Sequence, residues 1–221
     1  QARPTRMKRT FAEITPAVEK GEHPMNNQFK AHYPALVSSG ILGDIQTLLF
    51  GEQEIQAMVQ KLGNAISQDY AGETPVVVGV LKGVVFFMAD LLRAISIPVE
   101  MDFISISSYS SESRNQGYVR LLKDLDTSIQ DRHVLFIEDV IDTGLTLSYL
   151  LKNMRARQPA SLEVCCLFNK ARRRLIDLPI KYKGFDLPDQ FVVGYGLDYK
   201  EKYRNLPFVG VLKASVIQGS V

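Results

Sequence analysis

Apolar residues between positions 52 and 70 recur at steps of three and four, at Ile55, Met58, Val59, Leu62 and Ile66. This spacing predicts an amphipathic helix whose apolar stripe covers one face of a sheet. After Ala71-Gly72 the β-branched run 74–83 predicts a buried strand, and residues 84–95 return to helical spacing. The first part of the chain with a clear pattern therefore reads helix, strand, helix.

Strands and helices continue to alternate toward the carboxyl end. Residues 99–110 predict a strand that runs into the polar stretch 110–117 and returns through 118–125, which indicates a hairpin with a mobile loop. The later predicted elements are, in chain order, a strand at 133–140, a helix at 144–157, and strands at 161–170, 190–199 and 207–213.

Short connections between alternating strands and helices predict an α/β fold, with a mainly parallel core sheet flanked by helices. In such sheets ligands bind outside the carboxyl ends of the strands. The carboxyl ends of the predicted strands carry the polar residues Lys82-Gly83, Glu138-Asp139, Lys170 and Asp198. A polar ligand site is therefore expected along this edge.

Composition narrows the class of protein. The chain has 221 residues, 46% hydrophobic and 23% charged, which suits one α/β domain with an extension. The net charge of +2 does not call for a nucleic-acid partner, and no apolar run approaches the roughly 20 residues that span a bilayer. Cys165 and Cys166 are neighbours in a predicted strand, a poor geometry for a disulfide, so they are expected to be reduced. These features, with no signal-peptide core at the amino terminus, predict a cytoplasmic protein.

Residues 1–45 differ from the remainder. Prolines stand at positions 4, 16, 24 and 34, and basic residues cluster at the start of the chain. We expect an N-terminal extension here, flexible or partly non-native, with a basic binding arm as the alternative. The domain itself is predicted to comprise residues 46–221.

The stretch "HVLFIEDVIDTGLTL", residues 133–147, places three carboxylates, Glu138, Asp139 and Asp142, at the end of a core strand. The Thr-Gly-Leu-Thr turn at 143–146 opens the next helix, and backbone N–H groups at such a turn form a phosphate site. Its first threonine would equally serve as an N-cap. Carboxylates beside the turn could accept hydrogen bonds from ribose hydroxyls or hold magnesium, so the pattern indicates a sugar phosphate. Neither a dinucleotide fingerprint nor a P-loop is present in the sequence.

"VLFIEDVIDTG" resembles the phosphoribosyl-diphosphate signature of the type I phosphoribosyltransferases. Four further segments are similar, in order and spacing, to the hypoxanthine-guanine branch of this family: "LKG" at 81–83, "SSY" at 107–109, "NK" at 169–170 and "FVVGYGLDYKEKYRNLP" at 191–207. The likeness covers about residues 45–215. It implies the type I phosphoribosyltransferase fold, with a small hood region beside the core sheet.

The resemblance implies roles for the acidic stretch. Glu138 and Asp139 would bind the ribose hydroxyls and magnesium, and Asp142 would be the general base that takes the proton from the purine ring nitrogen. The 5′-phosphate would lie against the residues of the turn, with Leu145 contributing only its backbone amide: Asp142, Thr143, Gly144, Leu145 and Thr146.

The resemblance also implies the other ligand contacts. Diphosphate would be held by Lys82, Gly83 and Arg204, with the hairpin residues Ser108 and Tyr109 closing over it, and a cis peptide is implied between Leu81 and Lys82. The residues implied at the purine end are Lys170, Phe191, Val192 and Asp198. Lys170 would donate to the 6-oxo group, Phe191 would stack on the base, and Asp198 would hold a second magnesium. Taken alone, Lys170 also reads as a surface lysine and Phe191 as a core residue.

The implied activity is a magnesium-dependent transfer that joins hypoxanthine or guanine to 5-phosphoribosyl 1-diphosphate in purine salvage, giving IMP or GMP and diphosphate. Relatives are homodimers or homotetramers, which implies the same here. A transferase for another base, xanthine or adenine, stays open, as does a non-catalytic sensor of the phosphoribosyl donor. A sensor would have no need of Asp142, Lys170, Asp198 and Arg204 together. The basic triplet Arg172–Arg174 is expected in a solvated loop, with a charge contribution to anionic substrates as the alternative.

Overall fold

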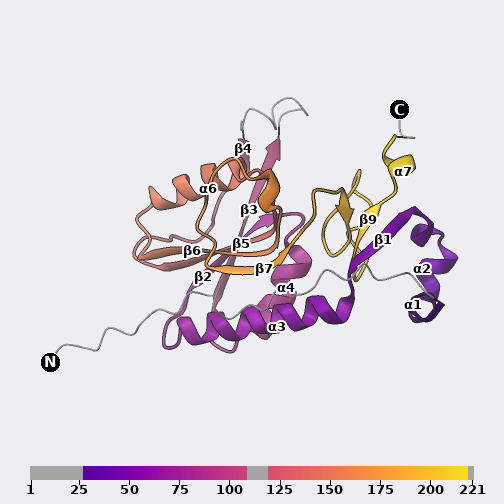
Figure 1. Cartoon of the computed structure of the whole chain (residues 1–221). Coiled ribbons are helices and arrows are strands. Elements are labelled where there is room, and N and C mark those ends of the chain that lie inside the picture. The colour runs from indigo at the N-terminus through magenta and orange to yellow at the C-terminus, as the bar shows by residue number, and fades with distance from the viewer. Residues whose placement is uncertain (1–26, 109–118, 219–221) are drawn as a thin grey trace.

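The computed structural model describes residues 27–108 and 119–218, and these form two sheets (Figure 1). The larger sheet has six strands in the order β4-β3-β2-β5-β6-β7, and only the β3–β4 pair is antiparallel. Its strands are β2 (Val76–Leu81), β3 (Glu100–Ser108), β4 (Val119–Lys123), β5 (His133–Ile141), β6 (Ser161–Asn169) and β7 (Tyr182–Asp186). The predicted mainly parallel α/β fold is confirmed.

Helices cover both faces of this sheet, which explains why its strands are apolar almost throughout. On one face, α3 (Glu52–Asp69) and α4 (Val85–Ala94) pack against residues such as Val77 and Leu135. On the other, α6 (Leu145–Arg155) packs against Val76, Val78 and their neighbours (Figure 1). Alternate residues of one strand thus serve opposite cores.

The second sheet is small and antiparallel, in the order β1-β9-β8, and corresponds to the expected hood region. It comprises β1 (Ile45–Phe50), β8 (Val192–Val193) and β9 (Val209–Leu212). The prediction that segments 190–199 and 207–213 complete the main sheet was wrong. Positive φ angles at Gly194, Tyr195 and Gly196 end β8 after two residues and turn the chain away.

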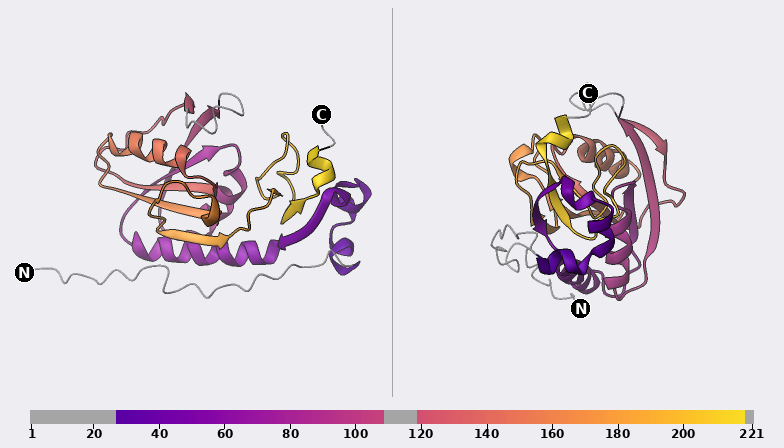
Figure 2. Two further views of the ribbon diagram at one scale, coloured as in Figure 1. Left: turned by 45° about the horizontal axis from the view of Figure 1, so that its top comes forward. Right: turned by 90° about the vertical axis from the view of Figure 1, so that its right-hand side faces the viewer.

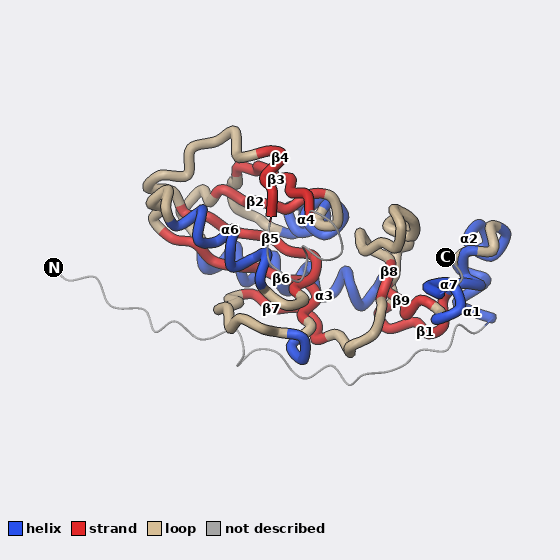
Figure 3. Tube along the Cα trace, turned by 90° about the horizontal axis from the view of Figure 1, so that it is seen from above, coloured by secondary structure: helices blue, strands red, loops and turns tan. Residues whose placement is uncertain are grey.

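Short helices cover the small sheet at one end of the molecule (Figures 2 and 3). They are α1 (Asn27–His32), α2 (Pro34–Ser38), the 3-10 turn η2 (Ile41–Asp44) and α7 (Ala214–Gln218). The rings of Phe29 and Tyr33 pack against Phe208, with centroids 5.2 and 6.0 Å away. Residues 27–44 therefore contact the hood, while the boundary drawn at 45/46 stays a prediction and residues 1–26 lie outside the described chain.

Two local predictions concern the segments next to the site. The strand predicted at 133–140 is β5, which includes Glu138 and Asp139 and continues to Ile141, where it pairs with Asn169 of β6. The predicted hairpin is present as β3 and β4, but its loop at 110–117 and Tyr109 lie outside the described residues. Cys165 and Cys166 are buried free thiols, as expected. Among the described helices, none has the length and hydropathy needed to cross a membrane.

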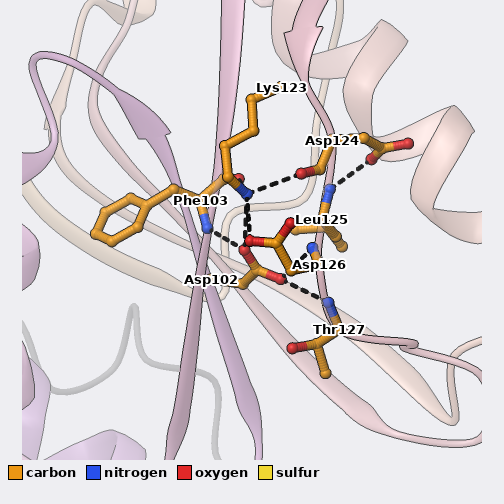
Figure 4. Close-up of polar contacts among 7 residues, drawn as sticks. All are labelled: Asp102, Phe103, Lys123, Asp124, Leu125, Asp126 and Thr127. Carbon is orange, nitrogen blue, oxygen red and sulfur yellow. Dashed lines mark hydrogen bonds and ion pairs between the residues drawn. The ribbon is translucent and has the colours of Figure 1, made fainter.

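A buried carboxylate joins the base of this hairpin to the chain that follows it (Figure 4). Asp102 is 6% exposed, and its Oδ2 accepts hydrogen bonds from the backbone N–H groups of Asp126 and Thr127 at 2.8 and 2.9 Å. Its Oδ1 accepts from the Phe103 N–H at 2.7 Å and from Lys123 Nζ at 3.3 Å. Burial alone would raise the pKa of Asp102, but these donors outweigh it and lower the pKa.

Candidate active site

A pocket of about 240 Å³ lies where the carboxyl ends of the parallel strands meet the loop after β8. Its lining residues are Gly83, Asp139, Val140, Asp142, Lys170, Val192, Leu197, Asp198 and Arg204. Most were predicted from the sequence. The apolar Val140 and Leu197 were not, although both lie inside the quoted motifs. A more open depression of about 410 Å³, which holds none of the predicted residues, lies beside residues 125–130, before the amino end of β5.

Two neighbouring carboxylates of β5 lie at the site, and only one of them lines the pocket. Asp139 is part of the lining, whereas Glu138 is buried outside it. Burial raises the pKa of Glu138 well above its usual value, and the neighbouring charge of Asp139 raises it further. Burial also raises the pKa of Asp139 to about 6, although its Oδ1 accepts the Val140 N–H at 2.7 Å. Anionic groups held this way gain from a cation or from hydroxyl donors.

The wall opposite Asp139 is made of glycine for a steric reason. A side chain on Gly83 would collide with Asp139 Oδ2, and one on Gly196 would collide with the backbone oxygen of Gly83. Gly196 also has a φ of +96°. The turn after β2 and the loop after β8 can therefore approach the carboxylates closely.

The turn at 142–146 opens α6 at the same edge. Gly144 is the N-cap, with a φ of +83°, so the alternative that Thr143 caps the helix was wrong. The Thr143 hydroxyl instead accepts a long hydrogen bond from the Leu145 N–H at 3.4 Å. The first N–H groups of an 11-residue helix lack intrahelical partners, and with the helix dipole they form an anion site.

Asp142 and Lys170 both line the pocket. Lys170 is 8% exposed and donates to the Gln190 carbonyl at 2.9 Å, which rules out the surface alternative. Burial lowers the pKa of Lys170, while the Asp142 carboxylate opposes this shift. Asp142 Oδ2 lies 3.1 Å from Arg173 Nη1, and its Oδ1 is buried without a hydrogen-bond partner among the described residues.

The expectation of a solvated basic triplet was wrong for Arg174, while Arg173 is exposed as expected but also forms an ion pair. Arg172 is exposed. Arg173 pairs with Asp142, and Arg174 donates to Asn169 Oδ1 while its Nε and Nη1 are buried. The sequence alone did not signal this, because adjacent arginines in a turn give no indication of which neighbours they contact.

The predicted diphosphate residues meet through a carboxylate that sequence reasoning missed. Glu201 lies 3.1 Å from Lys82 Nζ and 3.3 Å from Arg204 Nη2, and Arg204 also lies 2.8 Å from Asp198. Glu201 stands inside the segment 191–207, which was its only sequence signal. The Leu81–Lys82 peptide bond is cis.

The remaining predicted residues are placed as follows. Phe191, immediately before β8, is 43% exposed, with its ring edge-on to Tyr199 at 5.4 Å, so it is not a core residue. Val192 is buried at the pocket wall. Ser108 ends β3, and its side chain lies, with Tyr109, outside the described part of the structure.

The acidic residues fit a substrate-assisted magnesium site rather than an all-protein one. Within the described residues, no group of three or more His, Cys, Asp or Glu could hold a metal by itself. Mg²⁺ commonly takes one or two carboxylates and completes its shell with water and substrate oxygens. Glu138 and Asp139 offer such a pair, whereas Asp198 is already paired with Arg204.

Comparison with known proteins agrees with this arrangement. The family described as "Phosphoribosyl transferase domain" matches residues 49–200. The chain is 47% identical to the hypoxanthine-guanine phosphoribosyltransferase of Bacillus subtilis, over 79% of this chain and 97% of that protein. This chain belongs to the hypoxanthine-guanine phosphoribosyltransferase family. Another member, from Streptococcus agalactiae, is 49% identical over 78% of this chain and 96% of its own length.

Solved structures of this phosphoribosyltransferase family share the fold. A hypoxanthine phosphoribosyltransferase of Staphylococcus aureus has a TM-score of 0.77 at 43% identity, covering 80% of this chain and 96% of that one. A hypoxanthine-guanine phosphoribosyltransferase of Bacillus anthracis, with HEPES in its active site, has a TM-score of 0.74 at 45% identity, covering 76% and 99%. The type I phosphoribosyltransferase fold is therefore confirmed.

Proposed function

We propose that this protein transfers the 5-phosphoribosyl group of 5-phosphoribosyl 1-diphosphate to hypoxanthine or guanine, giving IMP or GMP and diphosphate in purine salvage. One observation carries the proposal. A single pocket combines the Asp139 carboxylate of β5, the buried cation Lys170, Arg204, and Asp142 at the start of the turn that opens α6. The Asp139 carboxylate suits the hydroxyls of a sugar phosphate, the lysine suits the oxygen of an oxopurine, and the arginine suits a leaving diphosphate.

The phosphoribosyl half of the donor would occupy the end of β5 and the start of α6. The 5′-phosphate would accept hydrogen bonds from the backbone N–H groups and hydroxyls of residues 142–146. Glu138 and Asp139 would accept hydrogen bonds from the ribose hydroxyls, directly or through magnesium. Magnesium, when bound, would supply positive charge beside the diphosphate.

The purine would lie between Lys170 and Phe191. The ammonium of Lys170 donates hydrogen bonds and accepts none, so it favours the 6-oxo group of hypoxanthine or guanine over the 6-amino group of adenine. The exposed ring of Phe191 offers a stacking surface, and the backbone of Val192 would contact the edge of the base.

Asp142 would act as the general base. As the ring nitrogen attacks the anomeric carbon, the bond from that carbon to the diphosphate oxygen breaks, and Asp142 takes the proton from the ring nitrogen. Lys82 and Arg204 would neutralise the departing diphosphate, whose oxygens would replace Glu201 on these cations. Exclusion of water matters here, because water would otherwise hydrolyse the donor.

Three further parts of the proposal rest on the resemblance or, for the cytoplasmic location, on composition. Asp198 would hold a second magnesium after giving up Arg204, and Ser108 and Tyr109 would close over the diphosphate. A cytoplasmic homodimer or homotetramer is the expected form of the protein.

The test is a spectrophotometric assay with hypoxanthine, guanine, xanthine and adenine, each with and without magnesium and the phosphoribosyl donor. We expect magnesium-dependent product with hypoxanthine or guanine. Product with only xanthine or adenine would instead identify a transferase for another base. Tight binding of the donor without product from any base would identify a sensor and refute the proposal.

A further inference from the structure

Arg173 links two loops that border the pocket. It ends the 3-10 turn η3 (Ala171–Arg173), directly after Lys170. Its Nη1 lies 3.1 Å from Asp142 Oδ2 and its Nε lies 3.5 Å from Asp189 Oδ1. The guanidinium therefore connects the turn after β5 with the loop after β7.

The backbone at η3 holds this arginine close to Asp142. The Lys170 N–H donates to the Ile141 carbonyl at 3.0 Å, and the Arg173 N–H donates to the Lys170 carbonyl at 3.0 Å. Ile141 immediately precedes Asp142 in the chain. The arginine and the carboxylate thus extend from backbone segments that are bonded to each other.

The two oxygens of Asp142 have different surroundings. Oδ2 is held by Arg173, whereas Oδ1 is buried and has no hydrogen-bond partner among the described residues. Asp142 also lines the pocket, as Lys170 does. A carboxylate with one oxygen buried and the other paired to an arginine keeps a defined orientation.

We infer that Arg173 is a positioning residue for the transfer reaction: it pairs with Oδ2 of Asp142 and so fixes the orientation in which this carboxylate meets the ring N–H of the bound purine. The inference rests on the proposed function. A rotated carboxylate would misplace the proton acceptor, and a displacement of about 1 Å at reacting groups costs roughly 100-fold in rate. The side chains of Arg173 and Asp142 are 47% and 42% exposed, so the pair contributes little to folding.

The experiment compares Arg173→Met, Arg173→Lys and the control Arg172→Met with the wild-type protein, using hypoxanthine and the phosphoribosyl donor. Methionine keeps length without charge, and lysine keeps the cation. Arg172 is exposed in the same turn and makes no ion pair with a described residue. We expect Arg173→Met to lower kcat about 10- to 100-fold. KM for the donor and Tm should stay near wild type, Arg173→Lys should recover part of kcat, and Arg172→Met should match wild type.

A double variant tests whether Arg173 acts through Asp142. Adding Arg173→Met to Asp142→Asn should lower kcat by less than about twofold further, because the group that Arg173 orients no longer accepts a proton. Full multiplication of the two single losses would overturn the inference, as would an Arg173→Met protein as active as wild type. Failure of the proposed function would be seen separately, as a wild-type protein that makes no product with any base.

Discussion

Replacing Asp102 with asparagine should destabilise the protein at neutral pH, because every neighbour of this carboxylate is a donor. Oδ2 accepts two backbone N–H groups, and Oδ1 accepts another together with Lys123 Nζ. An asparagine amide has one oxygen and one NH₂ group. Whichever way it turns, the NH₂ group faces two donors in a site that is only 6% exposed.

The expected loss in the free energy of unfolding is about 2–4 kcal/mol. Orienting the NH₂ group toward Phe103 and Lys123 costs least, because Lys123 is 39% exposed and can turn to water. One buried backbone donor then stays unsatisfied, at about 1–3 kcal/mol. The two bonds that remain lose their charge assistance, which accounts for the rest of the estimate.

Equilibrium urea unfolding at pH 7.5 measures this loss, with Asp126→Asn as the matched control. Asp126 is 82% exposed and also pairs with Lys123, at 2.9 Å, so its replacement should change stability by less than about 0.5 kcal/mol. A change at Asp102 no larger than that at Asp126 would refute the reasoning.

The same variant has a defined pH dependence. The pKa of Asp102 is lowered on folding, so its ionised form contributes stability that is fully present above the unfolded pKa of about 3.9. This contribution is lost as pH falls through the folded-state pKa. The stability difference between wild type and Asp102→Asn should therefore be constant from pH 6 to 8 and shrink below about pH 4. A difference that grows on acidification would contradict the assignment.

The other predictions concern the pocket and are read by steady-state kinetics. Asp142→Asn should lower kcat about 10²- to 10⁴-fold with little change in KM for the donor, and unchanged turnover would remove it as general base. Lys170→Met should raise KM for hypoxanthine about tenfold or more and lower the ratio of kcat/KM for hypoxanthine to kcat/KM for adenine. An unchanged ratio would show that other residues set this specificity. Glu201→Gln should lower KM for the donor a few-fold, because Lys82 and Arg204 lose a competing anion. A raised KM would show that Glu201 assists binding.

Most strands of the main sheet were predicted from local sequence patterns. The runs 76–81 and 134–137 are continuously apolar, a pattern typical of strands covered on both faces, and the helical stripe of residues 52–70 corresponds to α3. The sequence also predicted that the acidic residues lie beside the turn at 143–146, because β5, Gly144 and α6 follow one another in the chain.

Contacts between distant segments were decided only by the tertiary structure. Segments 190–199 and 207–213 carry strand-like residues, yet they join the hood. There β9 pairs with β1 and β8 pairs with β9, because periodicity reports which face is buried and not which strand lies alongside. Glu201 reaches Lys82 across 119 positions, and Arg173 meets Asp142 only because η3 folds back onto the end of β5. The sequence by itself determined the elements and the chemical groups they carry, whereas ion pairs among exposed loops depend on three-dimensional packing that no local pattern records.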